Sequence, residues 1–173
     1  MAQIARYLAG LCLAAVVHVL GLRLSSGFFS IVDPFLILTV VHSLRHGPAW
    51  SAVGGSVAGL TEDALTGGLY GLFGFANTLV AYVSAQVQGR FVVQQPLQVA
   101  LLCALAAALQ VVTLSLLQFA MVAHGELPSA AATAAKMVTT GLAGSGLWML
   151  TNRVRASISR RRLERSRRLR IDL

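Results

Sequence analysis

The chain has 173 residues, of which 56% are hydrophobic and only 12% are charged, and its mean hydropathy is +0.72. A soluble domain usually carries about 25% charged residues, because its surface must face water. Half that fraction leaves too few charges for a soluble surface, whereas a membrane helix needs roughly 20 mostly apolar residues. The composition excludes an ordinary soluble domain and predicts an all-α, polytopic membrane helical bundle.

The net charge is +8, and much of it lies at the C-terminal end, where nine arginines follow residue 152. No aromatic residue is interleaved among them, as stacking on nucleic-acid bases would require, so no nucleic-acid partner is expected. A basic run beside a span is more simply an orientation signal that contacts anionic lipid headgroups. The arginines expected to face lipid are Arg160, Arg161, Arg162, Arg165, Arg167 and Arg168.

The first two apolar runs cover residues 7–22 and 28–44. The first follows a single arginine and lacks a small-x-small cleavage pattern, so we expect an uncleaved anchor and not a signal peptide. In the second run Asp33 directly precedes Pro34. Aspartate suits an N-cap and proline is tolerated in the first helical turn, so this helix is expected to begin near Asp33.

The third and fourth apolar runs, residues 49–65 and 69–85, are joined by a glycine-rich turn. Two glycines and an aspartate in the third run are spaced four apart, so they share one helical face. Small residues at that spacing let transmembrane backbones approach closely. This face and the turn are therefore a candidate surface for another helix, in this protein or in a partner. Its residues are Gly55, Gly59, Asp63, Gly67 and Gly71.

The last two apolar runs cover residues 97–122 and 130–151. At 1.5 Å per residue the fifth run exceeds the hydrocarbon core of about 30 Å, so it should tilt or extend past the bilayer. It contains Gln98, Gln110 and Gln118, which we expect to hydrogen-bond across helices.

Six spans would place both termini on one side of the membrane. That side would hold 12 of the 14 lysines and arginines, and the other side would hold only Arg23 and Lys136. Cytoplasmic loops carry the excess of positive charge, so the N- and C-termini are expected in the cytoplasm. The expected organisation is a transmembrane domain over residues 1–152 and a basic cytoplasmic tail over residues 153–173.

Glu62 and Asp63 form the only adjacent acidic pair, near the outer end of the third span. Ionisable groups at membrane depth are costly, which makes them candidates for a cation, proton or substrate site. The alternative is a helix end with solvated carboxylates. The two side chains lie roughly 100° apart around a helix, so they cannot easily share one site.

His42 and His46 are four residues apart and could hold a metal from one helical face. No third ligand is near in the sequence, and Arg45 would repel a cation, so an interfacial role is favoured. His18 lies within the first span and is expected to hydrogen-bond inside the bundle. The sequence has no GxSxG, HExxH or P-loop motif, and we expect no catalytic residue, cofactor or metal site.

A series of short motifs follows along residues 33–90. They are Asp33-Pro34-Phe35-Leu36, Leu44-Arg45-His46-Gly47-Pro48, Gly54-Gly55-x-x-x-Gly59-Leu60-x-x-Asp63 and Gly67-Gly68-Leu69-x-Gly71-Leu72. This series resembles the MreD family of bacterial rod shape-determining membrane proteins. The resemblance implies a multi-pass protein of the bacterial inner membrane, with a fold like that of the substrate-binding subunits of energy-coupling-factor vitamin transporters.

The resemblance implies a partner role in cell-wall elongation: binding MreC and joining an assembly of MreB, RodA and a penicillin-binding transpeptidase. Pairing of the chain with itself, as a homodimer, is left open by the sequence. The alternative is a vitamin-binding subunit of a transporter. Such a subunit should have a pocket with several aromatic side chains. Only 7% of the residues are aromatic, and Trp50 and Trp148 lie near predicted span ends, as in an interfacial belt.

Overall fold

A computed structural model describes residues 2–24, 32–67, 69–91, 95–121 and 129–171. The expected all-α class is confirmed for this part of the chain, which forms six helices and no strand. The helices are α1 (Ala2–Leu24), α3 (Pro34–Ser43), α4 (Pro48–Thr66), α5 (Leu72–Arg90), α6 (Pro96–Met121) and α7 (Ala130–Ile171).

Proline and glycine set several helix boundaries. The predicted start of α3 is confirmed, because Asp33 is its N-cap and Pro34 its first residue. Pro48 and Pro96 likewise open α4 and α6. Their missing N–H groups cost nothing there, since the first amides of a helix have no intrahelical acceptor. Helix α4 ends at Gly67, whose φ of 67° is the left-handed conformation that glycine adopts without strain.

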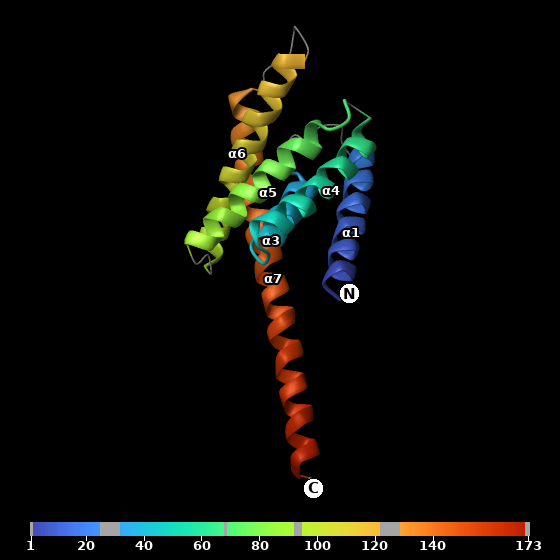
Figure 1. Ribbon diagram of the computed structural model, residues 1–173, viewed down its shortest axis with the longest axis vertical. Helices are drawn as coiled ribbons and strands as arrows, with labels where there is room; N and C mark the ends of the chain where they lie inside the picture. The colour runs from blue at the N-terminus through green and yellow to red at the C-terminus, as the bar shows by residue number, and fades with distance from the viewer. Residues whose placement is uncertain (1, 25–31, 68, 92–94, 122–128, 172–173) are drawn as a thin grey trace.

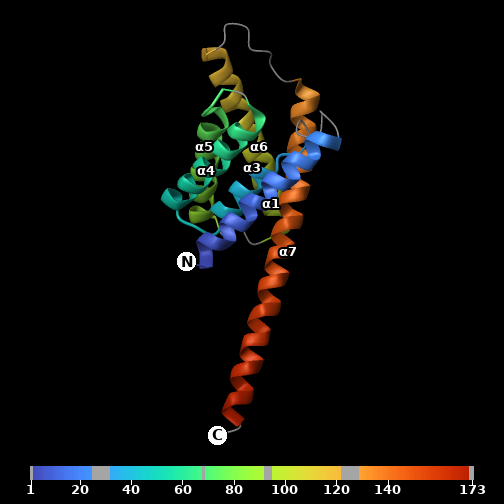
Figure 2. The ribbon, with the colours of Figure 1, turned by 90° about the vertical axis from the view of Figure 1, so that its right-hand side faces the viewer.

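The short helix α3 lies at the centre of the bundle and packs against all five other helices (Figures 1 and 2). The most extensively packed pairs are α4 with α5 and α6 with α7. By contrast, α1 packs only against α3 and α4 among the described helices. Helix α3 has 10 residues, so it is about 15 Å long and reaches only half-way across a hydrocarbon core of about 30 Å.

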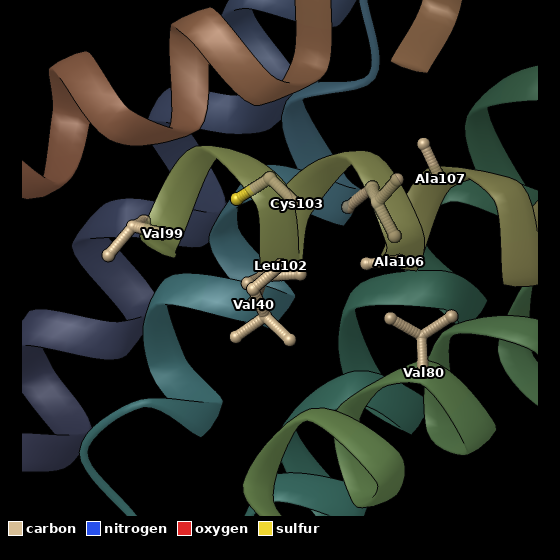
Figure 3. Close-up of a cluster of buried hydrophobic side chains, with 8 residues drawn as sticks. Val40, Val80, Val99, Leu102, Cys103, Ala106 and Ala107 are labelled. Atoms are coloured by element: carbon tan, nitrogen blue, oxygen red, sulfur yellow. The ribbon is translucent and has the colours of Figure 1, made fainter. Parts of the chain in front are cut away.

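Two apolar clusters hold the helices together, and α3 contributes to both. The larger one joins α3, α5 and α6, and Figure 3 shows how Val40 and Val80 face a row of α6 side chains. Its members are Leu36, Val40, Val80, Val99, Leu102, Cys103, Ala106 and Ala107. The smaller cluster joins α1, α3 and α4 through Ala14, Phe35 and Ala58.

Within the described residues, two helices are long and apolar enough to cross a membrane. They are Gln3–Gly21 and Pro96–Met121, with mean hydropathies of 1.8 and 2.3. The other helices are shorter or more polar, so their assignment as spans stays a prediction. Helix α7 runs without a break through residue 153, where a domain boundary was predicted, and projects far beyond the bundle (Figures 1 and 2).

The bundle has a tail end and an opposite end. The tail end is where α7 leaves the bundle; it also holds the start of α1, the α3–α4 turn at residues 44–47 and the end of α5 (Figure 1). The opposite end holds the start of α3, the end of α4 and the starts of α5 and α7.

Candidate functional site

The predicted glycine face of α4 packs against α5 of the same chain. A methyl group at Gly59 would overlap the carbonyl oxygen of Phe73, and one at Gly55 would overlap the carbonyl oxygen of Asn77. No side chain larger than hydrogen fits at either position without moving the backbone of α5. The close approach expected from the sequence is therefore made inside the bundle, and a role of these glycines in binding a partner is not tested by this geometry.

Gly67 and Gly71 form the turn between α4 and α5. Their φ angles are 67° and 99°, both in the left-handed region, and a methyl group at either would meet nothing within 4 Å. Backbone conformation, not space, requires glycine at these two positions. The turn brings the start of α5 back beside the end of α4.

Asp63 caps the start of α5 across this turn. Its carboxylate accepts hydrogen bonds from the backbone N–H groups of Gly71, Phe73 and Gly74, each at 3.0 Å. These are the amides that lack partners at a helix start, where the helix dipole also favours a negative charge. Asp63 is buried, so the alternative of a solvated helix end is wrong for this carboxylate.

Glu62 points into the bundle, away from the cap, as expected from its angle on the helix. It is buried, so it is not solvated either. Its Oε2 accepts a hydrogen bond of 3.0 Å from Nδ2 of Asn77, and Oδ1 of Asn77 accepts one of 3.0 Å from Nε2 of Gln110. Three buried polar side chains from α4, α5 and α6 are thus linked in a row.

An ion pair completes this row. Nζ of Lys136 lies 3.2 Å from Oδ2 of Asp33 and donates a hydrogen bond of 2.8 Å to Oε1 of Gln110. Nε2 of Gln110 also donates to Oδ2 of Asp33, at 2.8 Å. The other carboxylate oxygen of Asp33 caps α3 by accepting from the N–H of Leu36 at 2.9 Å. One aspartate therefore starts a helix and balances a buried cation.

These five side chains form one polar network, and each comes from a different segment: the α3 N-cap, α4, α5, α6 and α7. Its members are Asp33, Glu62, Asn77, Gln110 and Lys136. Burying a charge is costly unless it is paired and hydrogen-bonded, and here the partners lie within the chain. The arrangement joins five helices: Lys136 pairs with Asp33, and Glu62 is hydrogen-bonded to the amide of Asn77.

The sequence predicted part of this network. The cross-helix role of Gln110 is confirmed, whereas Gln98 and Gln118 are exposed. Asn77 was not singled out, and Lys136 was used only as a marker of orientation. The signal that could have identified both is their position: each is a strongly polar side chain within an otherwise apolar run, where polar groups face the bundle interior.

The histidines make local contacts. The rings of His42 and His46 are stacked with centroids 4.1 Å apart, and Tyr7 of α1 lies against His42 at 4.6 Å. His18 is buried against Phe35, with ring centroids 5.5 Å apart. No group of three or more potential metal ligands comes together among the described residues.

The tail arginines, residues 160–168, lie in the helical continuation of α7, but their side chains fall outside the part of the structure that is described. Contact of these arginines with lipid therefore stays a prediction.

The fold and the site define a class: an all-helical protein with apolar helices of membrane-spanning length and a self-contained polar network in its interior. Residues 1–149 match the family of rod shape-determining protein MreD, so the chain belongs to the MreD family and has a role in determining rod shape. The suspected resemblance is confirmed over the whole helical bundle. Neither a curated protein nor a solved structure gave a significant match.

Proposed function

We propose that this chain is a non-catalytic membrane scaffold subunit of the bacterial cell-wall elongation complex. In this role it binds MreC and helps to organise peptidoglycan synthesis together with MreB, RodA and a penicillin-binding transpeptidase. The observation that carries the proposal is the match to MreD over residues 1–149. The polar network supports it, because its charged side chains are engaged in holding five helices together.

The proposed topology has six spans in the bacterial inner membrane, with both termini in the cytoplasm. The short helix α3 counts as one of them, because it is enclosed by the other five helices and links the two ends of the bundle. The positions of the basic residues support it: Arg45 and Arg90 lie at the tail end of the bundle, and Lys136 lies toward the opposite end. The positive-inside rule then assigns the tail end to the cytoplasm. There the tail arginines would attract anionic lipid by roughly 1 kcal/mol each while they remain near the surface.

Testing this scaffold role needs a probe that does not disturb the bundle. Gly59 is unsuitable, because a larger residue there would displace α5 and any loss of complex could reflect misfolding. Cys12 offers a better position: it is exposed on α1, the least enclosed helix, whereas Cys103 is buried. Cys12 lies within the proposed first span, where a thiol ionises less readily than in water, so the crosslinker must be lipid-soluble and the reaction long; it should react at Cys12 and spare Cys103.

The experiment is crosslinking from Cys12 in host membranes, followed by detergent solubilisation, purification of the chain and mass spectrometry. Recovery of MreC, RodA or the transpeptidase is the expected result. A crosslink between the Cys12 residues of two chains would identify a second copy as a neighbour. The variant Cys12→Ala is the matched control, in which thiol-dependent products should disappear. Recovery of transporter ATPase subunits or a tightly held vitamin, without MreC, would overturn the proposal.

A further inference from the structure

A groove of about 470 Å³ lies at the tail end of the bundle, between the α3–α4 turn and the last turns of α5. It is separate from the polar network, whose members lie toward the opposite end. Its polar lining comes from Arg45 and His46 in the turn and from Gln86, Gln88 and Arg90 at the end of α5.

The charge of this groove is positive. Two of its lining residues are arginines and none is acidic. Three of the six acidic residues of the chain, Asp33, Glu62 and Asp63, are buried toward the opposite end of the bundle. Guanidinium groups present several N–H donors in a planar fork that matches the oxygens of a phosphate or carboxylate.

The backbone adds to this positive potential. Helix α4 starts at the groove with Gly47 as its N-cap and Pro48 as its first residue, and no side chain caps it. The first N–H groups of a helix and its dipole favour an anion at such a position. The carbonyl end of α5 acts in the opposite sense, and Arg90 in its last turn offsets that effect.

One side of the groove is held in place by α7. Nη2 of Arg45 donates to Oγ1 of Thr151 at 2.7 Å and to Oδ1 of Asn152 at 3.5 Å. On the other side, Nε2 of Gln86 donates to the hydroxyl of Tyr82 at 3.0 Å. Arg45 is thus positioned before any ligand arrives, and Arg90 is exposed at the open side.

We propose that this groove binds the phosphate of an anionic ligand through Arg45, Arg90 and the start of α4. Basic pockets between transmembrane helices on the cytoplasmic side are suited to anionic headgroups, and the proposed topology places the groove at that surface. The same chemistry would accept free inorganic phosphate. The inference concerns a ligand site of the isolated chain and does not require binding of MreC.

The test is native mass spectrometry of the full chain in detergent, titrated with phosphatidylglycerol, with phosphatidylcholine and with inorganic phosphate. The wild-type chain should retain phosphatidylglycerol and not phosphatidylcholine. Because Arg90→Gln removes a charge-assisted hydrogen bond to the phosphate, the variant should bind phosphatidylglycerol about tenfold or more weakly. Arg90→Lys keeps the charge but loses the planar guanidinium, so its affinity for phosphatidylglycerol should fall between those of the wild type and Arg90→Gln.

Two control variants separate the groove from other basic surfaces. Arg153→Gln removes an exposed arginine at the same end of the bundle but outside the groove, and Arg160→Gln with Arg161→Gln removes charge from the tail. Both should retain the lipid. Competition by inorganic phosphate would identify a general phosphate site, and retention despite phosphate would identify a lipid headgroup site. Equal retention of both lipids without phosphate binding, or wild-type affinity in Arg90→Gln, would overturn the proposal.

Discussion

The two ends of the bundle use charged residues in opposite ways. At the end away from the α7 tail, four charged residues are buried or nearly so: Asp33, Glu62, Asp63 and Lys136. The carboxylates there accept hydrogen bonds from side-chain amides, from backbone N–H groups or from the lysine. At the tail end the groove is lined by arginines without an acidic residue among them. Charge therefore organises the interior at one end and provides a surface for anions at the other.

A charged residue inside an apolar sequence is therefore not by itself a binding site. The buried charges share partners within the chain, and removing one partner leaves the other unpaired in an apolar interior, which is costly. At the tail end Arg90 is exposed, and the proposed topology places it where anionic headgroups lie. Substitutions at the two ends should therefore change different properties, namely stability in one case and ligand affinity in the other.

The largest effect is expected from Lys136→Met. The change leaves Asp33 buried without its cation, and breaking a buried pair in this way costs about 3–5 kcal/mol. Thermal unfolding in detergent should show a strongly lowered midpoint, and the double variant Asp33→Asn with Lys136→Met should recover much of the loss. Arg23→Met removes an exposed cation from the same end and should leave the midpoint nearly unchanged. Equal midpoints for Lys136→Met and wild type would mean that the ion pair does not hold the bundle.

A smaller loss is expected from Gly59→Ala. The added methyl group would overlap the carbonyl oxygen of Phe73 and push α5 away from α4, and overpacking of this kind costs about 1–3 kcal/mol. The measurement is again the unfolding midpoint. Gly146→Ala is the matched control, because a methyl group there meets nothing within 4 Å and alanine favours a helix. If both variants unfolded at the same temperature, the close approach of α4 and α5 would not be needed.

The smallest effect on stability is expected from Arg45→Gln at the tail end. The variant loses the 2.7 Å hydrogen bond from the guanidinium to Thr151, while the contact to Asn152 at 3.5 Å is at the limit of a hydrogen bond and contributes little. Glutamine can still donate to one of these oxygens and no buried charge is left unpaired, so the expected loss is about 1 kcal/mol or less. Hydrogen exchange should show faster exchange where α7 leaves the bundle and little change in α4 and α5. A loss of stability as large as that of Lys136→Met would contradict the proposed division between the two ends.

The sequence was sufficient to predict the number and approximate positions of the helices, because apolar runs, prolines and glycines are local signals. It did not predict that α7 continues to Ile171, because the residues after 152 lack an apolar pattern. The start of α3 at Asp33 and the close-packing glycines of α4 followed from such signals. The partners of the polar side chains did not, because Asp33 and Lys136 are about 100 residues apart and nothing local links them. The alternative that Glu62 and Asp63 are solvated at a helix end was wrong for the same reason. Their partners, Asn77 and the start of α5, come close to them only when α5 folds back on α4.

The continuous course of α7 has a mechanical consequence. From Asn152 to Ile171 it forms a rod of about 28 Å at 1.5 Å per residue, longer than the screening distance of about 8 Å at physiological salt. Standing upright in the proposed topology, this rod would carry its outermost arginines beyond the electrostatic reach of the bilayer. The rod would then act as a spacer. Its tilt is set where Arg45 is hydrogen-bonded to α7, and this tilt decides whether the arginines lie against lipid or in the cytoplasm.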